Sequence, residues 1–238
     1  MSGNMHHSIW LQNHSLDDGI CAGAYEAAGA LARSTLKLCI ARLHAFWGEA
    51  PLASVTSLSY AQGFSLVRDR TPVPYALILC PVSHAHPAQL LAACLPAILA
   101  NVPLIIPCLV VEGAQRVLAK GAQSFLPESA NALLAALELA GLEQTAVAGE
   151  AEVLECIALL HQDLGPGRIA VLGEPGFGDA FALAAYRLGA SLFNGTAAQP
   201  AEGTSTFSVD AAHEGIWIWP DLGPDWFCLS RLEISKRE

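Results

Sequence analysis

Residues 74–109 read PYALILCPVSHAHPAQLLAACLPAILANVPLIIPCL, and this stretch predicts one compact β-α-β unit. Tyr75–Cys80 and Pro103–Leu109 are short apolar runs, and the Ala- and Leu-rich residues from His86 to Ala100 favour a helix between them. Neither run alternates between polar and apolar residues. That is typical of a parallel strand that is buried on both faces and covered by the helix that follows it.

The same alternation continues to about residue 190. Pro127 and Glu128 begin a predicted helix that stops at Gly141. Strands are then predicted at 145–148 and 168–172, and helices at 150–161 and 179–188. This order predicts an α/β fold with a Rossmann-like parallel sheet and flanking helices.

The segments outside this region differ in character, and we divide the chain into three parts. Residues 1–70 form a helical N-terminal segment packed on the core, 71–195 the Rossmann-like domain, and 196–238 a β-rich C-terminal extension or oligomerisation arm. In the first part, we expect the polar Met1–Asn13 to fray, and a helix to run through Ala22–Trp47 with a break near Gly29 or Gly48.

The sequence patterns that predict strands near the two ends of the chain are less regular. Phe64–Arg68 is interpreted as an edge strand. Thr204–Val209, Gly215–Trp219 and Trp226–Ile234 are β-prone and predict a hairpin or meander that closes the sheet edge or serves as the arm.

The composition bears on partners. Hydrophobic residues make up 53% of the 238 residues and charged residues 14%. Because so little polar surface is available, we expect an apolar area to meet a second subunit, which favours a homo-oligomer. The net charge of −10 and the scattered Lys and Arg residues disfavour a nucleic-acid partner.

The sequence also indicates the compartment. Leu90–Val111 is apolar, but Asn101 and three prolines interrupt it, so a helix-strand pair explains it better than a membrane span. Met1–Ser15 lacks the features of a secretory signal. The odd number of cysteines, seven, without a CxxC pair predicts reduced, buried thiols and a cytoplasmic location.

The first candidate site follows from the sheet. Ligands of such folds bind beyond the carboxyl ends of the strands, which selects Pro81, Ser83, His84 and His86. The two histidines suit contact with a phosphate, or acid-base work near neutral pH. A metal needs further ligands at suitable spacing, and none lies nearby in the sequence, so no metal is predicted. The alternative is a polar loop with His86 at a helix start.

The second candidate site is glycine-rich. Gly173, Pro175, Gly176 and Gly178 lie between a predicted strand and a helix, where backbone N–H groups can cradle an anion. The motif is neither a Walker loop nor GxGxxG, Glu174 opposes phosphate, and the alternative is a tight turn that needs glycine. The same two interpretations, an anion-binding turn or a tight turn, apply to Gly149 and Glu150, for which the sequence pattern is weaker.

No residue is assigned to catalysis. Cys80 and Cys228 lie in apolar runs, where packing is expected rather than a nucleophilic thiol. Ser205, Asp210 and His213 lack the GxSxG context of a hydrolase.

The order of these motifs resembles the histidinol dehydrogenase family of the aldehyde-dehydrogenase-like superfamily. The similarity spans roughly residues 30–195. It rests on the helix Ala32–Phe46 and on the following segments: Pro81-Val82-Ser83, His86-Pro87-Ala88, Pro96–Pro103, Leu139–Leu142, Ala148–Glu152 and Gly173–Phe177.

The resemblance implies NAD as a cofactor, because members of that family are NAD-dependent, zinc-containing enzymes. The family's Gln-Ala-Glu-His zinc motif, its catalytic Glu-His pair and its Gly-Pro-Asn-His segment have no counterparts here. The Gln and Asn associated with cofactor contact are replaced by Ala151 and Phe177. Zinc is therefore not expected.

Three functional hypotheses follow. The first is a catalytically incomplete relative that binds a small ligand or nucleotide at the turns after the strands. The second is an active NAD-dependent oxidoreductase that completes its site across a homodimer. The third is a purely structural oligomeric module.

Overall fold

The computed structural model describes residues 6–48, 54–84, 86–113, 126–142, 144–174, 176–196 and 217–236. The helices within them are α1 (His6–His14), α2 (Asp18–Ala27), α3 (Ala30–Trp47), α4 (Pro87–Leu99), α5 (Asn131–Leu139), α6 (Glu150–Leu164) and α7 (Asp179–Leu188), with 3-10 turns η2 (Glu128–Ala130) and η3 (Pro224–Phe227). The strands are β1 (Ser54–Tyr60), β2 (Phe64–Pro72), β3 (Ala76–Pro81), β4 (Ile105–Val111), β5 (Ala146–Gly149), β6 (Arg168–Gly173), β7 (Ser191–Thr196) and β8 (Cys228–Lys236).

Five strands form one parallel sheet in the order β5-β4-β3-β6-β7. Ala76 at the start of β3 pairs with Ile105 on one side and Arg168 on the other. The chain therefore adds β4 and β5 on one side of β3, then crosses back to add β6 and β7 on the other. The predicted α/β fold with a parallel sheet is confirmed, and the reversal of direction lies between β3 and β6.

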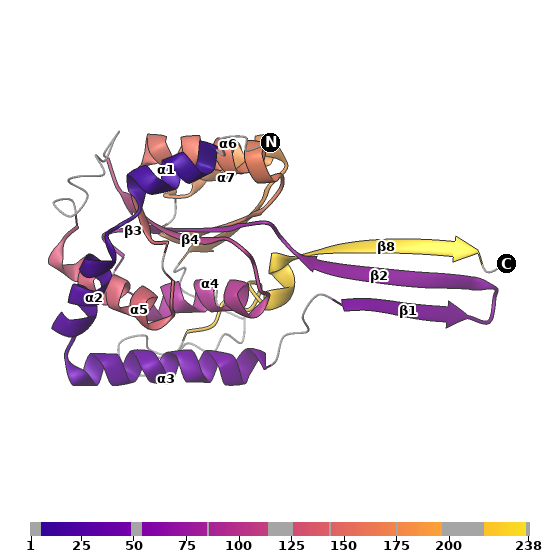
Figure 1. Ribbon diagram of the computed structural model, residues 1–238, viewed down its shortest axis with the longest axis horizontal. Helices are drawn as coiled ribbons and strands as arrows, with labels where there is room; N and C mark the ends of the chain where they lie inside the picture. The colour runs from indigo at the N-terminus through magenta and orange to yellow at the C-terminus, as the bar shows by residue number, and fades with distance from the viewer. Residues whose placement is uncertain are drawn as a thin grey trace.

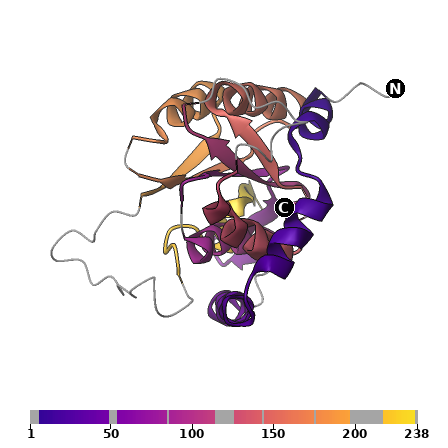
Figure 2. The same ribbon diagram turned by 90° about the vertical axis from the view of Figure 1, so that its left-hand side faces the viewer.

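Helices cover both faces of this sheet (Figures 1 and 2). Helices α4 and α5 lie on one face with α2 and α3 outside them, and α6, α7 and α1 cover the other. Alternate residues of β3 belong to the hydrophobic clusters on the two sides of the sheet: Ile78 and Cys80 to one cluster, and Leu77 and Leu79 to the other. Because every β3 residue is buried, an apolar run without alternation is the expected sequence.

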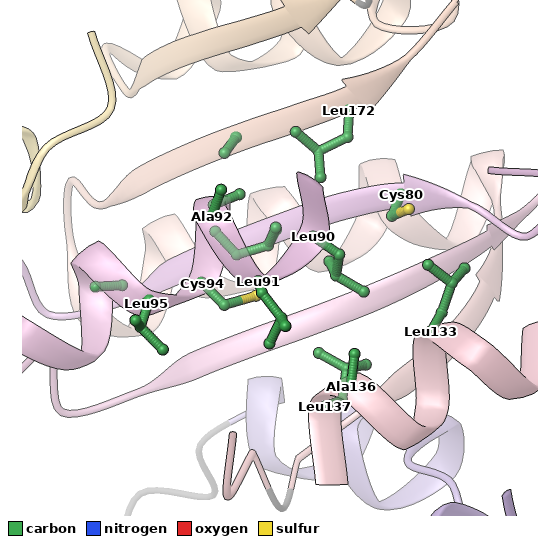
Figure 3. Packing of buried hydrophobic residues seen from close by; sticks show 14 of the residues in the cluster. Cys80, Leu90, Leu91, Ala92, Cys94, Leu95, Leu133, Ala136, Leu137 and Leu172 are labelled. Atoms are coloured by element: carbon green, nitrogen blue, oxygen red, sulfur yellow. The ribbon is translucent and has the colours of Figure 1, made fainter. Parts of the chain in front are cut away.

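The larger cluster is built from aliphatic side chains of α4 and α5. Figure 3 shows Leu90, Leu91 and Leu95 along α4, and Leu133 and Leu137 on α5, in the same cluster as Cys80 and Leu172 of the sheet. Helix α4 is buried around most of its circumference, and this burial in the protein core explains why its sequence is apolar. No helix in the described residues combines the length and apolarity needed to cross a bilayer.

The N-terminal residues do not fray as expected. Residues 6–13 belong to helix α1, which packs on α6, and Trp10 is only 4% exposed. The backbone N–H and ring of His7 bond to Asp163, with Nδ1 2.9 Å from Oδ2, and lower the pKa of Asp163 to about 2. The prediction was wrong because long-range contacts, which local polarity does not reveal, hold this helix.

A second, antiparallel sheet projects from the body in the order β1-β2-β8 (Figure 1). Phe64–Arg68 is therefore not an edge strand but part of β2, the central strand of this separate sheet. The N-terminal segment 1–70, which was predicted to be helical, contains β1 and most of β2 in its residues 54–70. Its third strand, β8, comes from the far end of the chain. The sequence could not indicate this pairing because it joins residues more than 150 positions apart.

The predicted C-terminal hairpin or meander is not present in the described part of the chain. Trp217–Trp219 has no strand conformation, Trp226 and Phe227 belong to η3, and β8 pairs with β2. Thr204–Val209 and the first two residues of Gly215–Trp219 lie outside the described residues. Of the two predicted positions for a helix break, Gly29 lies in the gap between α2 and α3, and Gly48 caps the end of α3.

Arg168 connects the base of the projecting sheet to the parallel sheet through hydrogen bonds. Its Nε donates to the Trp226 carbonyl oxygen at 2.6 Å, and its Nη1 to the Ser191 hydroxyl at 2.7 Å. The guanidinium carbon also lies 5.4 Å from the centre of the Trp226 ring. The backbone N–H of Val73, just after β2, donates to the Phe227 carbonyl.

We predict that Gly167→Ala destabilises the protein. A Cβ at Gly167 would lie 2.5 Å from Cζ of Tyr75, whose side chain is fully buried, so the ring must move. Overpacking of this kind is expected to lower the free energy of unfolding by about 1–3 kcal/mol, measured by urea denaturation. As a control, Gly23→Ala in α2 meets nothing within 4 Å and should be neutral or stabilising. Equal stability of Gly167→Ala and the native protein would contradict the packing described.

Candidate functional site

The predicted site residues lie where parallel strands end. Pro81 closes β3, Gly149 closes β5 and Gly173 closes β6. Because these strands are parallel, the turns that follow them share the carboxyl edge of the sheet. The remaining predicted residues occupy those turns or begin the next helix: Ser83, His84, His86, Glu150, Gly176 and Gly178. Pro175 lies outside the described residues.

The ends of β3 and β6 come into direct contact. A Cβ added to Gly173 would lie 3.3 Å from Cγ of Pro81 and 2.9 Å from Cδ1 of Phe177. Gly173 also has a φ of +150°, so both its conformation and its surroundings require glycine. Phe177, which packs edge to face against Phe181, therefore sits close over the end of β6.

Gly149 and Glu150 share the edge but not this contact. Strand β4 separates β5 from β3, which places Gly149 about 10 Å from the end of β3. The N–H of Gly149 donates to Glu152 Oε2 at 3.0 Å, and Glu152 also pairs with His14 of α1 at 3.3 Å. The start of α6 is thus capped by its own acid, so the donor at Gly149 is already used. Its role as a ligand site stays a prediction.

His84 is a neutral imidazole in a partly buried position. Burial, with a smaller contribution from the nearby His86, lowers its pKa to about 4, although a side-chain interaction with Gln89 offsets part of this shift. The two histidine rings stand nearly perpendicular, with centroids 5.3 Å apart. Within the described structure, the buried Nε2 of His84 and the buried Oε1 of Gln89 have no hydrogen-bond partner.

Three residues near the edge were missed from the sequence. Glu112 follows β4 and accepts a 2.5 Å hydrogen bond from the Ser83 hydroxyl, which ties the turns after β3 and β4 together. Gln89 is 2% exposed, and its backbone carbonyl oxygen accepts a hydrogen bond from Trp219 Nε1. Glu112 could have been found by the rule that selected Ser83, because it directly follows an apolar strand. Gln89 gave no such signal, and Phe177 stood out only as the residue that replaces an Asn of the resembling family.

The described turns of this edge carry acids and no Lys or Arg. The acids are Glu112, Glu150, Glu152, Glu174 and Asp179. Within the described residues, no group of three or more His, Cys, Asp or Glu side chains is arranged to hold a metal ion. The edge therefore offers polar and anionic groups to a ligand.

The thiols are placed for packing. Six of the seven cysteines are buried, and Cys228 is half-buried. Burial raises the pKa of Cys21 and Cys39 to about 11, and also raises the pKa values of Cys80 and Cys228. A thiol with a raised pKa is a poor nucleophile near neutral pH.

A hollow of about 290 Å³ lies elsewhere, lined by Leu16, Cys21, Glu138 and Thr145 among others. Thr145 precedes β5, so this hollow lies toward the amino end of that strand rather than the carboxyl edge.

Comparison with known proteins identifies the fold. No family model and no curated protein matches the chain. Among solved structures, histidinol dehydrogenase from Elizabethkingia anophelis superposes with a TM-score of 0.58 at 14% identity, over 76% of this chain and 39% of that one.

Two further structures are similar at lower scores. PnpE in complex with nicotinamide adenine dinucleotide gives a TM-score of 0.43 at 13% identity, over 82% of this chain and 39% of that one. Succinate-semialdehyde dehydrogenase from Burkholderia pseudomallei gives 0.40 at 16% identity, over 68% and 30%.

The match to histidinol dehydrogenase shows that the chain has an α/β fold of the same kind. The chain spans about two fifths or less of the length of these three proteins. The resemblance inferred from the sequence is confirmed at the level of this fold, and the match to histidinol dehydrogenase supports it.

We predict that His84 makes stability fall in mild acid. Its pKa is about 4 when folded and about 6.5 when unfolded, so the unfolded chain binds the proton more tightly. The loss of folding stability caused by His84 is therefore absent above about pH 6.5 and grows as the pH falls toward about 4. His84→Gln should lose less stability than the native protein between about pH 7.5 and pH 5 in urea titrations. The control His44→Gln, at an exposed position on α3, should match the native protein. An identical pH dependence in His84→Gln would contradict the burial of this ring.

Proposed function

We propose that this protein is a catalytically incomplete, histidinol-dehydrogenase-like domain that binds a small polar ligand between the ends of β3 and β6. This is the point of the sheet where the strand order reverses, and open α/β sheets bind their ligands there. The dehydrogenase-like fold supports the place of the site, and the chemistry must come from the residues themselves.

One observation carries the proposal. The side chains of His84 and Gln89 interact with each other, yet the buried Nε2 of His84 and the buried Oε1 of Gln89 lie within hydrogen-bond distance of no partner in the described structure. Buried polar atoms in folded proteins normally have partners, because an unpaired one costs about 1–3 kcal/mol. A ligand group that offers hydrogen bonds to these two atoms would remove that cost. His84 lies in the turn after β3, and Gln89 lies in the first turn of α4.

The incomplete chemistry follows from what the described edge contains. The buried His84 is neutral, the Cys80 thiol has a raised pKa, and the catalytic and zinc motifs of the resembling family are missing from the sequence. Binding without turnover is the function that these groups support.

The charges indicate which part of a ligand would be bound. Glu112, Glu150 and Glu174 oppose phosphate, and the described turns supply no Lys or Arg to offset them. A nucleoside or another uncharged polar group suits the edge better than a pyrophosphate. NAD, which the family resemblance implies, would bind here mainly through its uncharged parts.

A thermal-shift titration tests the proposal. The panel is NAD, NADH, NADP and ATP, with adenosine and nicotinamide riboside as phosphate-free counterparts. A ligand present at 100 times its Kd should stabilise the protein by about 2.7 kcal/mol, or roughly 5–10 °C in Tm. His84→Ala and Ser83→Ala should weaken binding, whereas His44→Ala on α3 should not.

The outcomes separate the hypotheses. No shift with any member of the panel would remove the nucleotide and nucleoside forms of the proposal. NADH formation from NAD with an alcohol or aldehyde substrate, abolished by His84→Ala, would instead support an active oxidoreductase that completes its site across a homodimer.

A further inference from the structure

Helix α3 is the outermost helix on its side of the molecule (Figures 1 and 2). It packs on α4 and α5, and its inward residues Leu36, Cys39 and Leu43 are buried in the cluster that those helices share. Its outward side is not simply polar, as that of a surface helix normally is. Leu31 is 82% exposed and Leu38 is 47% exposed. Apolar residues on both sides of one helix indicate that a further layer covers it.

The outward residues of α3 have the spacing of a coiled-coil seam. Leu31, Leu38 and Ala45 follow one another at intervals of seven residues. Ser34 and Ala41 lie between them, at the second core position of the same heptad repeat. All five side chains are exposed, and we call them the α3 seam. Because three of the five are small, the leucines of a partner helix can fit between Leu31 and Leu38, close to the α3 backbone.

Basic side chains flank the α3 seam on both sides. Lys37 and His44 occupy the heptad positions along one side of it, and Arg42 lies along the other. Helix α3 contains no Asp or Glu, and its charge of +3 contrasts with −13 on the rest of the chain. The positions beside a coiled-coil seam select the partner by charge. The flanks of α3 therefore favour a partner helix that carries acids.

We infer that the α3 seam binds an acidic amphipathic helix of a partner protein. The apolar stripe of that helix covers Leu31 and Leu38, and its carboxylates lie beside Lys37 and Arg42. This inference does not depend on the proposed ligand site, because α3 belongs to the outer layer of helices and the ligand site to the carboxyl edge of the sheet.

Two other occupants fit the α3 seam less well. A second copy of α3 would bring more basic residues and no acids to the flanks, so no ion pair would form across the contact. An anionic membrane surface is flat and wide, and Asp18 and Glu26 of α2 are exposed in the same outer layer. Such a surface would meet those acids as well as Lys37, whereas a helix in the seam meets α3 alone.

The length of the seam sets the expected strength of binding. Residues 31–45 span about 21 Å of helix, and a helix with its side chains is about 10 Å wide. This contact is small beside a standard interface, which buries about 800 Å² on each partner. We therefore expect a matching helix to bind with a Kd of roughly 10–100 µM.

Fluorescence anisotropy with a labelled synthetic peptide tests the inference. The peptide is three repeats of Leu-Ala-Gln-Leu-Glu-Ala-Glu, which places leucines at both core positions and glutamates on both flanks. The native protein should bind it in about 0.15 M salt, where a Debye length of about 8 Å screens the distant acids of the chain but not Lys37 and Arg42. A peptide of the same composition with its leucines out of register should not bind.

Matched variants show where the peptide binds. Leu38→Gln should weaken binding about tenfold, whereas Leu183→Gln, at a similarly exposed position on α7, should leave it unchanged. Lys37→Glu should weaken binding about fivefold, because it replaces an attraction with a repulsion. Arg187→Glu makes the same change of charge on α7 and should have little effect. Circular dichroism and thermal unfolding show whether each variant is folded.

Several outcomes would overturn the inference. They are a native protein that does not bind the acidic peptide, equal binding of the out-of-register peptide, and a loss of binding in Leu183→Gln as large as that in Leu38→Gln. Two further measurements identify a different occupant. Co-sedimentation with phosphatidylglycerol vesicles that Leu38→Gln abolishes, without peptide binding, would assign the seam to a membrane surface. Self-association that Leu38→Gln abolishes, again without peptide binding, would assign it to a second copy.

Discussion

The structure depends on the burial of β3 on both faces. This strand lies in the middle of the five-stranded sheet, and its side chains alternate between two separate hydrophobic clusters. Helices must therefore cover both faces, which requires the chain to build outward on one side and then return to build on the other. The meeting of β3 and β6, with the turns that follow them, is a direct result of that return.

Much of this architecture could be predicted because it is local. The helix predicted at 179–188 has those bounds in the structure, and the run 75–80 differs from β3 by one residue at each end. Helix α1 and the β2-β8 pairing could not be predicted, since the contacts that stabilise them join distant parts of the chain. His7 and Trp10 look like surface residues until Asp163 and α6 are placed beside them.

The positions of the candidate residues on the sheet edge could be predicted from the sequence, but the contacts between them could not. The sequence placed Pro81, Ser83 and Gly173 at one edge because parallel strands end together. It did not indicate that Phe177 would press on Gly173 or that Glu112 would bond to Ser83, because these contacts depend on rotamers and turn geometry. The candidate residues remain a prediction from topology, to which the partnerless atoms of His84 and Gln89 add a chemical reason.

The pairing of β2 with β8 has a consequence for the order of folding. Its partners are separated by 156 to 172 positions in the chain, so closing this ladder requires a very large loop, while the parallel sheet forms from units of a few tens of residues. On the ribosome, β1 and β2 emerge early and have to wait as a lone hairpin until nearly all of the remaining chain has been made. During that interval one long strand edge stays unpaired, so the nascent protein is most exposed to unwanted association with other chains before its last strand arrives.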